Sequence, residues 1–272
     1  HLPVRGYKSF DSGTNALPKV IAKIKEFNAT SSNPLNEAQL EALEALCTVL
    51  SATNRYHASQ IDSAGLKVIS HMVSSWDVAT CFPALDLARL VVIHPHAASR
   101  ERATFWKSLL QATLTQCQAA NTSSVPVSML SLRLFANCFR GGGGAVEAVM
   151  ELGQAILEYA VATVGMDNKN VRLALSTLLL NAASFSHTNK NKSTSSSSLQ
   201  PMFEVIAAIL GRYKAFESEA LVRTLTALGT LLLLVGTDSS KPWSSLVQPI
   251  VDAGGNTKAV AVAKEIQSIQ SN

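Results

Sequence analysis

The sequence is poor in charged and aromatic residues, and this narrows the kinds of protein it can encode. Charged residues make up 15% and aromatic residues 6% of the chain, against 47% hydrophobic residues. A core with so few rings must be built from Leu, Ala, Val and Ile, a mixture that favours packed helices. The net charge is +4 without a long run of Lys or Arg, so the composition disfavours a dedicated nucleic-acid binder. An acidic peptide fits this modest positive charge better.

Cysteine is also scarce. The four cysteines are far apart and form no Cys-x-x-Cys pair: Cys47, Cys81, Cys117 and Cys138. Their spacing indicates neither a zinc site nor a disulfide framework. We interpret them as buried thiols of a reducing compartment, and we expect no metal and no cofactor.

Long apolar runs are missing too. The longest, Leu225 to Gly236, is shorter than the roughly 20 residues of a membrane-spanning helix, and the first residues lack the pattern of a signal peptide. We therefore expect no membrane association and a soluble protein of the cytoplasm and the nucleus. We also expect the protein to be monomeric. Because the sequence begins at His1, we expect it to be part of a longer protein.

Catalytic motifs are absent as well. There is no Gly-x-Ser-x-Gly, His-Glu-x-x-His or Cys/His constellation, so the sequence predicts that the chain is not an enzyme. The four glycines Gly141 to Gly144 lack the Lys-Ser/Thr that completes a phosphate-binding loop. His94 and His96 flank Pro95 at a predicted helix end, where a C-terminal cap or a surface role is more plausible than metal binding.

Helical periodicity fills the chain between these absences. Apolar residues recur every three to four positions, and no run alternates between apolar and polar residues as a strand would. A first helix is expected from about Leu17, and a second after Asn36, which can cap it. Shorter helices are expected around Leu246 and Ile266. The remaining expected helices are Ile61–Met72, Ala84–Ile93, Arg102–Leu114, Ser128–Phe139, Val146–Val164, Asn170–Phe185, Leu199–Tyr213 and Glu219–Val235. The glycines 141–144 and residues 119–127 are expected to be loops.

An internal repeat accompanies the helices. Leu-Ala-Arg89-Leu matches Ser-Leu-Arg133-Leu, and 133 minus 89 is 44; Phe-Ala-Asn137 matches Leu-Leu-Asn181, and 181 minus 137 is again 44. Armadillo and HEAT units have a period of roughly 40 to 47 residues. The sequence therefore predicts one all-α domain over residues 1–272, an armadillo/HEAT-like right-handed helical solenoid, with an extended lead-in from His1 to about Asp11 and a disordered loop at 187–198.

The repeat register selects candidate binding residues. The register places Thr177 at the position equivalent to Arg133 one repeat later. Arg223 takes the equivalent position in the repeat after that, if the register is shifted by two residues. One helix of each repeat lines a concave groove in such solenoids, where Asn can bond a peptide backbone and Arg a carboxylate or phosphate. The candidate groove residues are Arg89, Arg133, Asn137, Asn181 and Arg223.

A purely structural interpretation of the same residues stays open. Arg89 would then pair with Asp86 one turn earlier, and Arg133 would extend along the surface with its charged end in solvent. Asn137 and Asn181 would satisfy loop carbonyls as buried amides.

Several motifs, in order along the chain, resemble the PUL domain. They are Pro3–Tyr7 with Phe10-Asp11, Phe82–Asp86 with Arg89-Leu90 and His94-Pro95, Leu132-Arg133 with Asn137–Phe139, Asn168–Asn170 with Leu178–Asn181, and Ala227–Leu231. The resemblance covers essentially the whole chain.

This resemblance implies a function. It implies an armadillo-like domain whose basic concave groove binds the extreme C-terminal tail of a hexameric AAA ATPase, valosin-containing protein, in ubiquitin-dependent protein turnover. The resemblance also implies that Arg89 and Arg223 correspond to arginines that line the groove in this family. Two alternatives are a basic helical scaffold that binds nucleic acid, and a regulatory domain attached to an isopeptidase-like enzyme.

Overall fold

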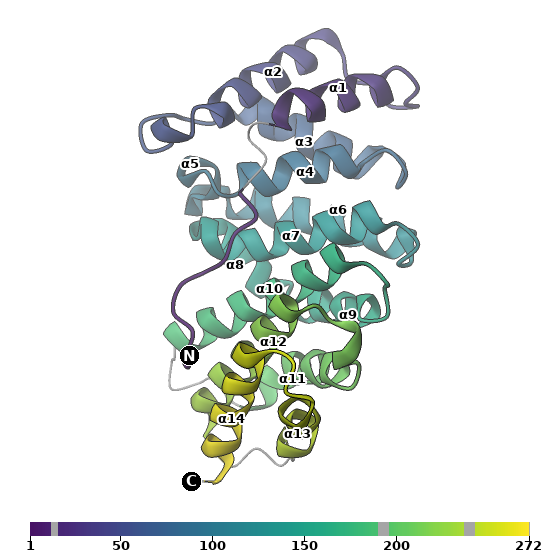
Figure 1. The fold of residues 1–272 in the computed structure, drawn as a ribbon. Helices are drawn as coiled ribbons and strands as arrows, with labels where there is room; N and C mark the ends of the chain where they lie inside the picture. Colours follow the sequence, from purple (N-terminus) through teal and green to yellow (C-terminus); the bar gives the residue numbers. More distant parts are fainter. Residues whose placement is uncertain (12–15, 190–195, 237–242, 272) are drawn as a thin grey trace. The chain divides into compact units, whose positions relative to one another are not determined.

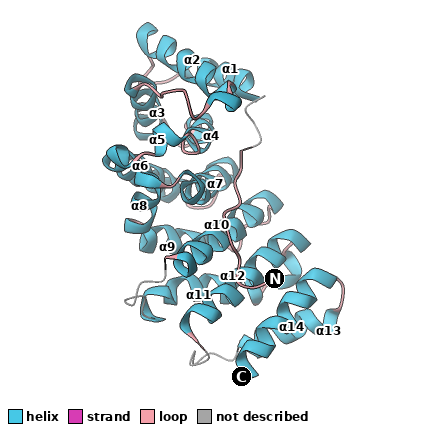
Figure 2. Cartoon of the chain, turned by 90° about the vertical axis from the view of Figure 1, so that its left-hand side faces the viewer, coloured by secondary structure: helices cyan, strands magenta, loops and turns pink. Residues whose placement is uncertain are grey.

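All regular secondary structure in the described part of the chain is helical (Figure 2), which confirms the expected all-α solenoid class. The structure is a computed structural model, and the residues it describes are 1–11, 16–189, 196–236 and 243–271. They divide into two compact units. We call Ser9–Ile156 the N-terminal unit, and His1–Lys8 together with Leu157–Asn272 the C-terminal unit.

The N-terminal unit is built from α-helices joined by short connections and two 3-10 turns. They are α1 (Leu17–Asn28), α2 (Glu37–Ser51), η2 (Thr53–Arg55), α3 (Ser63–Ser75), α4 (Phe82–Val91), α5 (Pro95–Ala98), η3 (Arg100–Arg102), α6 (Ala103–Ala120), α7 (Val125–Gly141) and α8 (Gly143–Glu151). Within this unit α4 packs against α7, α1 and α3, while α6 packs against α3, α7 and α8 (Figure 1). Each helix therefore buries its apolar face against helices of the preceding or following repeat.

The C-terminal unit is also built from packed helices. They are α10 (Lys169–Thr188), α11 (Ser196–Leu210), η4 (Tyr213–Ala215), α12 (Ser218–Val235), α13 (Trp243–Ala253) and α14 (Thr257–Ser271); α9 (Gly153–Thr163) contains the point at which the two units meet in sequence. Helix α12 packs between α10 and α14 (Figure 1). It is long and apolar enough to cross a membrane, but 72% of it is buried inside the protein, as expected of a core helix.

Local sequence signals start the helices where the sequence predicts them. The side chain of Asn36 accepts a hydrogen bond from the N–H of Gln39, and the side chain of Gln39 accepts one from the N–H of Asn36, which closes a capping box. Pro83 lies in the first turn of α4, where no backbone N–H is needed. Pro95 does not simply end the preceding helix as expected, because α4 stops at Val91 and Pro95 begins the short helix α5.

One expected helix is two. The sequence predicts a single helix over Val146–Val164, whereas α8 ends at Glu151 and α9 begins at Gly153. Leu152 lies between them with φ −92° and ψ 8°, outside the α-helical region. Apolar periodicity alone does not register such a break, because the residues on both sides keep the same spacing.

The four consecutive glycines are not the expected loop. Gly141 ends α7, Gly143 and Gly144 begin α8, and Gly142 alone separates the two helices, with φ +72°. A Cβ atom on Gly141 would overlap the carbonyl oxygen of Val92, and one on Gly144 would lie 2.7 Å from the backbone of Ala103. The glycines therefore allow backbones to approach within the N-terminal unit, a role that composition does not distinguish from flexibility.

The expected loop at 187–198 is shorter than predicted. Helix α10 extends to Thr188 and helix α11 begins at Ser196, so both ends of the Ser-rich stretch are helical. Residues 190–195 lie outside the described residues.

Candidate peptide-binding site

Asn137 of α7 holds both backbone groups of Phe10. Its Oδ1 accepts a 2.8 Å hydrogen bond from the Phe10 N–H, and its Nδ2 donates to the Phe10 carbonyl oxygen at 3.2 Å. Nδ2 also donates to the backbone carbonyl of Arg89 at 2.7 Å, and the side chain is fully buried. An Asn amide carries the donor and the acceptor that one extended residue requires, so Phe10 is bound as a peptide ligand would be.

Arg89 of α4 completes the contact with Phe10. Its Nη1 donates to the Phe10 carbonyl oxygen at 2.6 Å, and its Nε donates to Asp86 at 2.6 Å. The residue is only 5% exposed. The ion pair with Asp86 that the structural interpretation anticipates is therefore present, and the same guanidinium also binds an extended backbone. The two interpretations of Arg89 are not exclusive.

Arg133 of α7 lies over the Phe10 ring, with 4.8 Å from the guanidinium carbon to the ring centroid. Its Nε is buried and has no hydrogen-bond partner within the described residues. Burial lowers the pKa of Arg133, and the nearby charge of Arg89 lowers it further, while Asp86 acts in the opposite direction. This cation therefore lies beside the bound segment with unused hydrogen-bonding capacity, which an anionic ligand could satisfy.

Asn181 of α10 repeats the arrangement in the C-terminal unit. Its Oδ1 accepts from the N–H of Lys8 at 2.9 Å, and its Nδ2 donates to the Lys8 carbonyl oxygen at 2.7 Å. One turn further along α10, the Ser184 hydroxyl donates to the Gly6 carbonyl oxygen at 3.1 Å. The repeat that relates Asn137 to Asn181 in sequence is therefore reflected in equivalent chemistry at Phe10 and Lys8.

Helix α12 holds the beginning of the same segment. The Thr230 hydroxyl oxygen accepts from the N–H of Val4 at 3.0 Å. The side chain of Leu2 lies against Gly229, where any Cβ atom would overlap it. Neither Thr230 nor Ser184 is predicted from the sequence to bind a peptide. Buried hydroxyls in apolar helices usually bond their own backbone, as Thr230 also does toward Thr226.

Arg223 of α12 is engaged differently from Arg89. Its Nε donates to Glu219 at 2.9 Å and its Nη1 donates to the Thr177 hydroxyl at 2.5 Å. The repeat register places Thr177 and Arg223 in equivalent positions, and in the C-terminal unit they are in contact. No hydrogen bond joins Arg223 to residues 1–8 among the described residues, so its place in the predicted groove stays a prediction.

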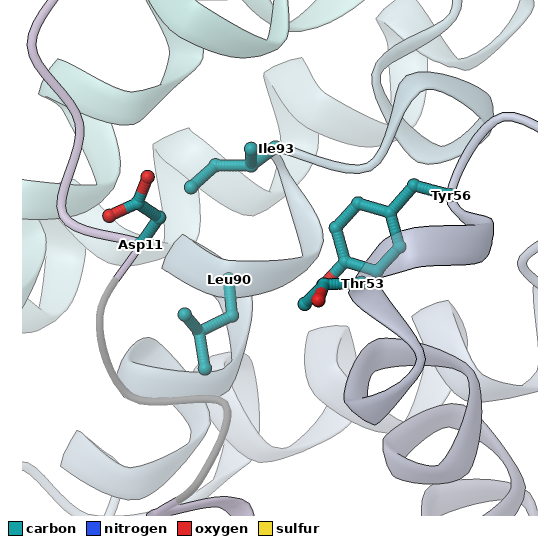
Figure 3. A pocket seen from close by; sticks show the side chains of 5 residues that line it. All are labelled: Asp11, Thr53, Tyr56, Leu90 and Ile93. Carbon is teal, nitrogen blue, oxygen red and sulfur yellow. The ribbon is translucent and has the colours of Figure 1, made fainter.

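A cavity of about 300 Å³ lies in the N-terminal unit beside the end of the bound segment (Figure 3). Its lining is Asp11, Thr53, Tyr56, Leu90 and Ile93. Leu90 directly follows Arg89 in α4, and Asp11 directly follows Phe10. The cavity therefore adjoins the residues that hold Phe10, a feature that no sequence pattern indicates.

Packed helices, with one buried asparagine in each unit that binds the backbone of a residue near the N-terminus, define the chain as an all-α helical-repeat domain. A comparison with protein families identifies the family: the PUL domain model matches residues 2–265. The chain therefore belongs to the PUL domain family. The chain is also 28% identical over 223 residues to phospholipase A-2-activating protein of Xenopus laevis, which covers 79% of this chain and 26% of that protein. It thus spans about a quarter of the length of this curated relative. The PUL domain is a protein-interaction module.

Proposed function

We propose that this PUL domain is an adaptor that binds the acidic C-terminal tail of a hexameric AAA ATPase, valosin-containing protein, in ubiquitin-dependent protein turnover. Membership of the PUL family supports a protein partner. The net charge of +4 favours an acidic one.

The observation that carries the proposal is the contact of Asn137 and Arg89 with Phe10. Three hydrogen bonds join these two side chains to the backbone of Phe10: the Phe10 N–H donates one to Asn137, and Asn137 and Arg89 each donate one to the Phe10 carbonyl oxygen. Such contacts accept any sequence with an extended backbone, so specificity must come from charges nearby. The guanidinium of Arg133, whose Nε is unpaired, supplies a charge suited to a carboxylate.

The direct test is a calorimetric titration of the domain with the tail peptide. A scrambled peptide of equal charge and a C-terminally amidated peptide serve as controls. Specific tail binding requires that both controls bind at least about tenfold more weakly, which corresponds to about 1.4 kcal/mol. Equal binding of all three peptides, or a steep loss with salt that is independent of sequence, would favour the nucleic-acid scaffold instead.

Arginine variants locate the binding residues. Arg133→Ala should weaken tail binding by about one to two decades, which is the size of a charge-assisted hydrogen bond. The affinity of Arg133→Lys should lie between those of the parent and of Arg133→Ala, because lysine keeps the charge but not the bidentate geometry. Arg140→Ala removes the same charge from an exposed position of the same helix and is the matched control. The double variant Arg89→Ala with Arg223→Ala should abolish binding. Affinity within a factor of about three of the parent, under about 0.7 kcal/mol, would exclude the arginine-lined groove as the site.

A further inference from the structure

The cavity beside Asp11 has the composition of a small binding site. It measures about 300 Å³, and all the residues that line it belong to the N-terminal unit. Figure 3 shows Leu90 and Ile93 between Asp11 on one side and Tyr56 with Thr53 on the other. Sites for small molecules usually measure roughly 300 to 1,000 Å³. A cavity at the lower end of this range accepts one side chain rather than a larger ligand.

The apolar walls of the cavity are held in place before any ligand binds. Leu90 belongs to α4 and is 2% exposed. The Tyr56 hydroxyl donates to the Leu50 carbonyl oxygen at 2.9 Å, and the Tyr56 ring packs against the His94 ring with 4.8 Å between the centroids. These contacts fix the aromatic wall, so a ligand does not have to order it. Aliphatic and aromatic walls suit an apolar stem, and a tyrosine ring also attracts a cation.

The polar groups of the cavity are hydrogen-bond acceptors with unused capacity. The Asp11 carboxylate is exposed, and its Oδ2 accepts a hydrogen bond from the Ser9 hydroxyl at 3.0 Å. Its Oδ1 and the Thr53 hydroxyl bond no group among the described residues. Of the described residues that line the cavity, only Asp11 is charged. A negative charge and a hydroxyl above an apolar floor suit a ligand with an apolar stem and a positively charged end.

The neighbouring arginine does not cancel the charge of Asp11. Arg89 directly precedes Leu90, but its guanidinium is 5% exposed and donates to the Asp86 carboxylate. Its remaining contact is with the carbonyl oxygen of Phe10, and it does not line the cavity. The charge of Arg89 is therefore balanced inside the unit, whereas that of Asp11 is available to a ligand.

The hydrogen bond from Ser9 distinguishes between the two basic side chains. A guanidinium binds a carboxylate best through both oxygens, but Oδ2 of Asp11 is already engaged. A lysine ammonium is a compact charge on a four-carbon stem, and one carboxylate oxygen is sufficient for it. Asp11 and Thr53 are exposed, so a side chain that projects from another protein can enter between them.

We propose that this cavity binds a lysine side chain of a partner protein, with the ammonium at Asp11 and the stem against Leu90 and Tyr56. The proposal does not rest on tail binding, because neither Arg89 nor Asn137 takes part in it.

The test is a titration of the full chain with the terminally blocked peptide Gly-Gly-Lys-Gly-Gly, followed by NMR of the methyl groups of Leu90 and Ile93. Both signals should shift saturably, with a dissociation constant on the order of millimolar, as expected for a ligand of this size. Peptides with ε-N-acetyl-lysine or arginine at the central position should bind at least about fivefold more weakly. Equal binding of the three peptides would overturn the proposal, as would unshifted signals at about ten times the expected constant.

Asp11→Asn keeps the shape of the side chain and removes its charge, so it should weaken lysine binding at least about tenfold. Asp77→Asn is the matched control, because Asp77 is also exposed, belongs to the same unit and does not line the cavity. Both variants should fold as the parent does, since surface substitutions change stability little. An affinity of Asp11→Asn within a factor of about two of the parent would overturn the proposal.

A free amine tests whether the ligand comes from a protein. The n-butylammonium ion has the stem and the charge of lysine without a peptide backbone. It should bind no more tightly than the lysine peptide if the mouth of the cavity admits a side chain attached to a chain. Binding of n-butylammonium at least about tenfold tighter than that of the peptide would mean that the backbone is excluded, and would overturn the assignment to a protein partner.

Discussion

Arg89 donates from Nη1 to the carbonyl oxygen of Phe10 at 2.6 Å, across 79 residues of sequence. The same guanidinium pairs with Asp86, three residues earlier in its own helix. A residue selected from the repeat for ligand binding therefore also contributes to the folded structure. Substitutions at this position must be judged by stability as well as by affinity.

Arg89→Ala should lower the free energy of unfolding by about 2 to 3 kcal/mol, because it leaves Asp86 without its cation and removes a bond to Phe10. Arg223→Ala should cost only about 0.5 to 1 kcal/mol, since its partner Glu219 is 57% exposed and screened by solvent. Urea denaturation of both variants measures the difference. Equal losses would contradict the unequal burial of the two arginines.

Gly141→Ala should destabilise the protein by about 1 to 3 kcal/mol or more, because the new Cβ would overlap the carbonyl oxygen of Val92. Gly153→Ala is the control: nothing lies within 4 Å of its added Cβ, and alanine favours the first turn of α9. Its expected effect is between zero and a gain of about 1 kcal/mol. Thermal unfolding of the pair decides whether the glycine run exists for packing or for flexibility; an unperturbed Gly141→Ala would refute the packing role.

Stability should fall below about pH 6.5 because of His94. The sequence predicts a C-terminal cap or a surface role for His94, but this side chain is fully buried. Its Nδ1 accepts from the N–H of His96 at the start of α5, and its Nε2 lies 2.9 Å from the Ser59 hydroxyl. Burial lowers the pKa of His94, and His96 lowers it further. The unfolded chain, with a His pKa near 6.5, therefore binds this proton first as the pH falls.

Melting temperatures from pH 8 to pH 5 test this expectation. His94→Asn should flatten the profile, because Asn can cap α5 without titrating. His57→Gln changes an exposed histidine and should leave the profile unchanged. A pH profile of His94→Asn identical to that of the parent would show that another group causes the decline.

The native thiols should be almost inert toward a disulfide reagent at pH 8. Burial raises the pKa of Cys47 and of Cys81 to about 12, and it also raises the pKa of Cys138. Only the thiolate reacts, so labelling should follow unfolding rather than direct attack. Labelling rates should therefore rise with urea in parallel with loss of helical signal. Rapid reaction of a thiol in the folded protein would contradict the burial of these side chains.

The sequence predicts the helices well because their signals are local. The capping box of Asn36 and Gln39 and the proline at the start of α4 act within one turn, and each is present in the structure. The break at Leu152 and the helical state of Gly143 and Gly144 could not be predicted in this way. Both depend on what packs alongside, which local periodicity does not record.

The sequence by itself determined the all-α class, the 44-residue register and the selection of Asn137 and Asn181 as polar residues within buried helices, since spacing and residue type suffice for these. Only the tertiary structure decided what these side chains bind. Phe10 is 127 residues from Asn137, and Lys8 is 173 residues from Asn181. Contacts at such a separation produce no recognisable pattern in the sequence, because the asparagines bind backbone groups, which every residue carries. The contacts of Phe10 and Lys8 with the two asparagines were therefore not visible in the sequence.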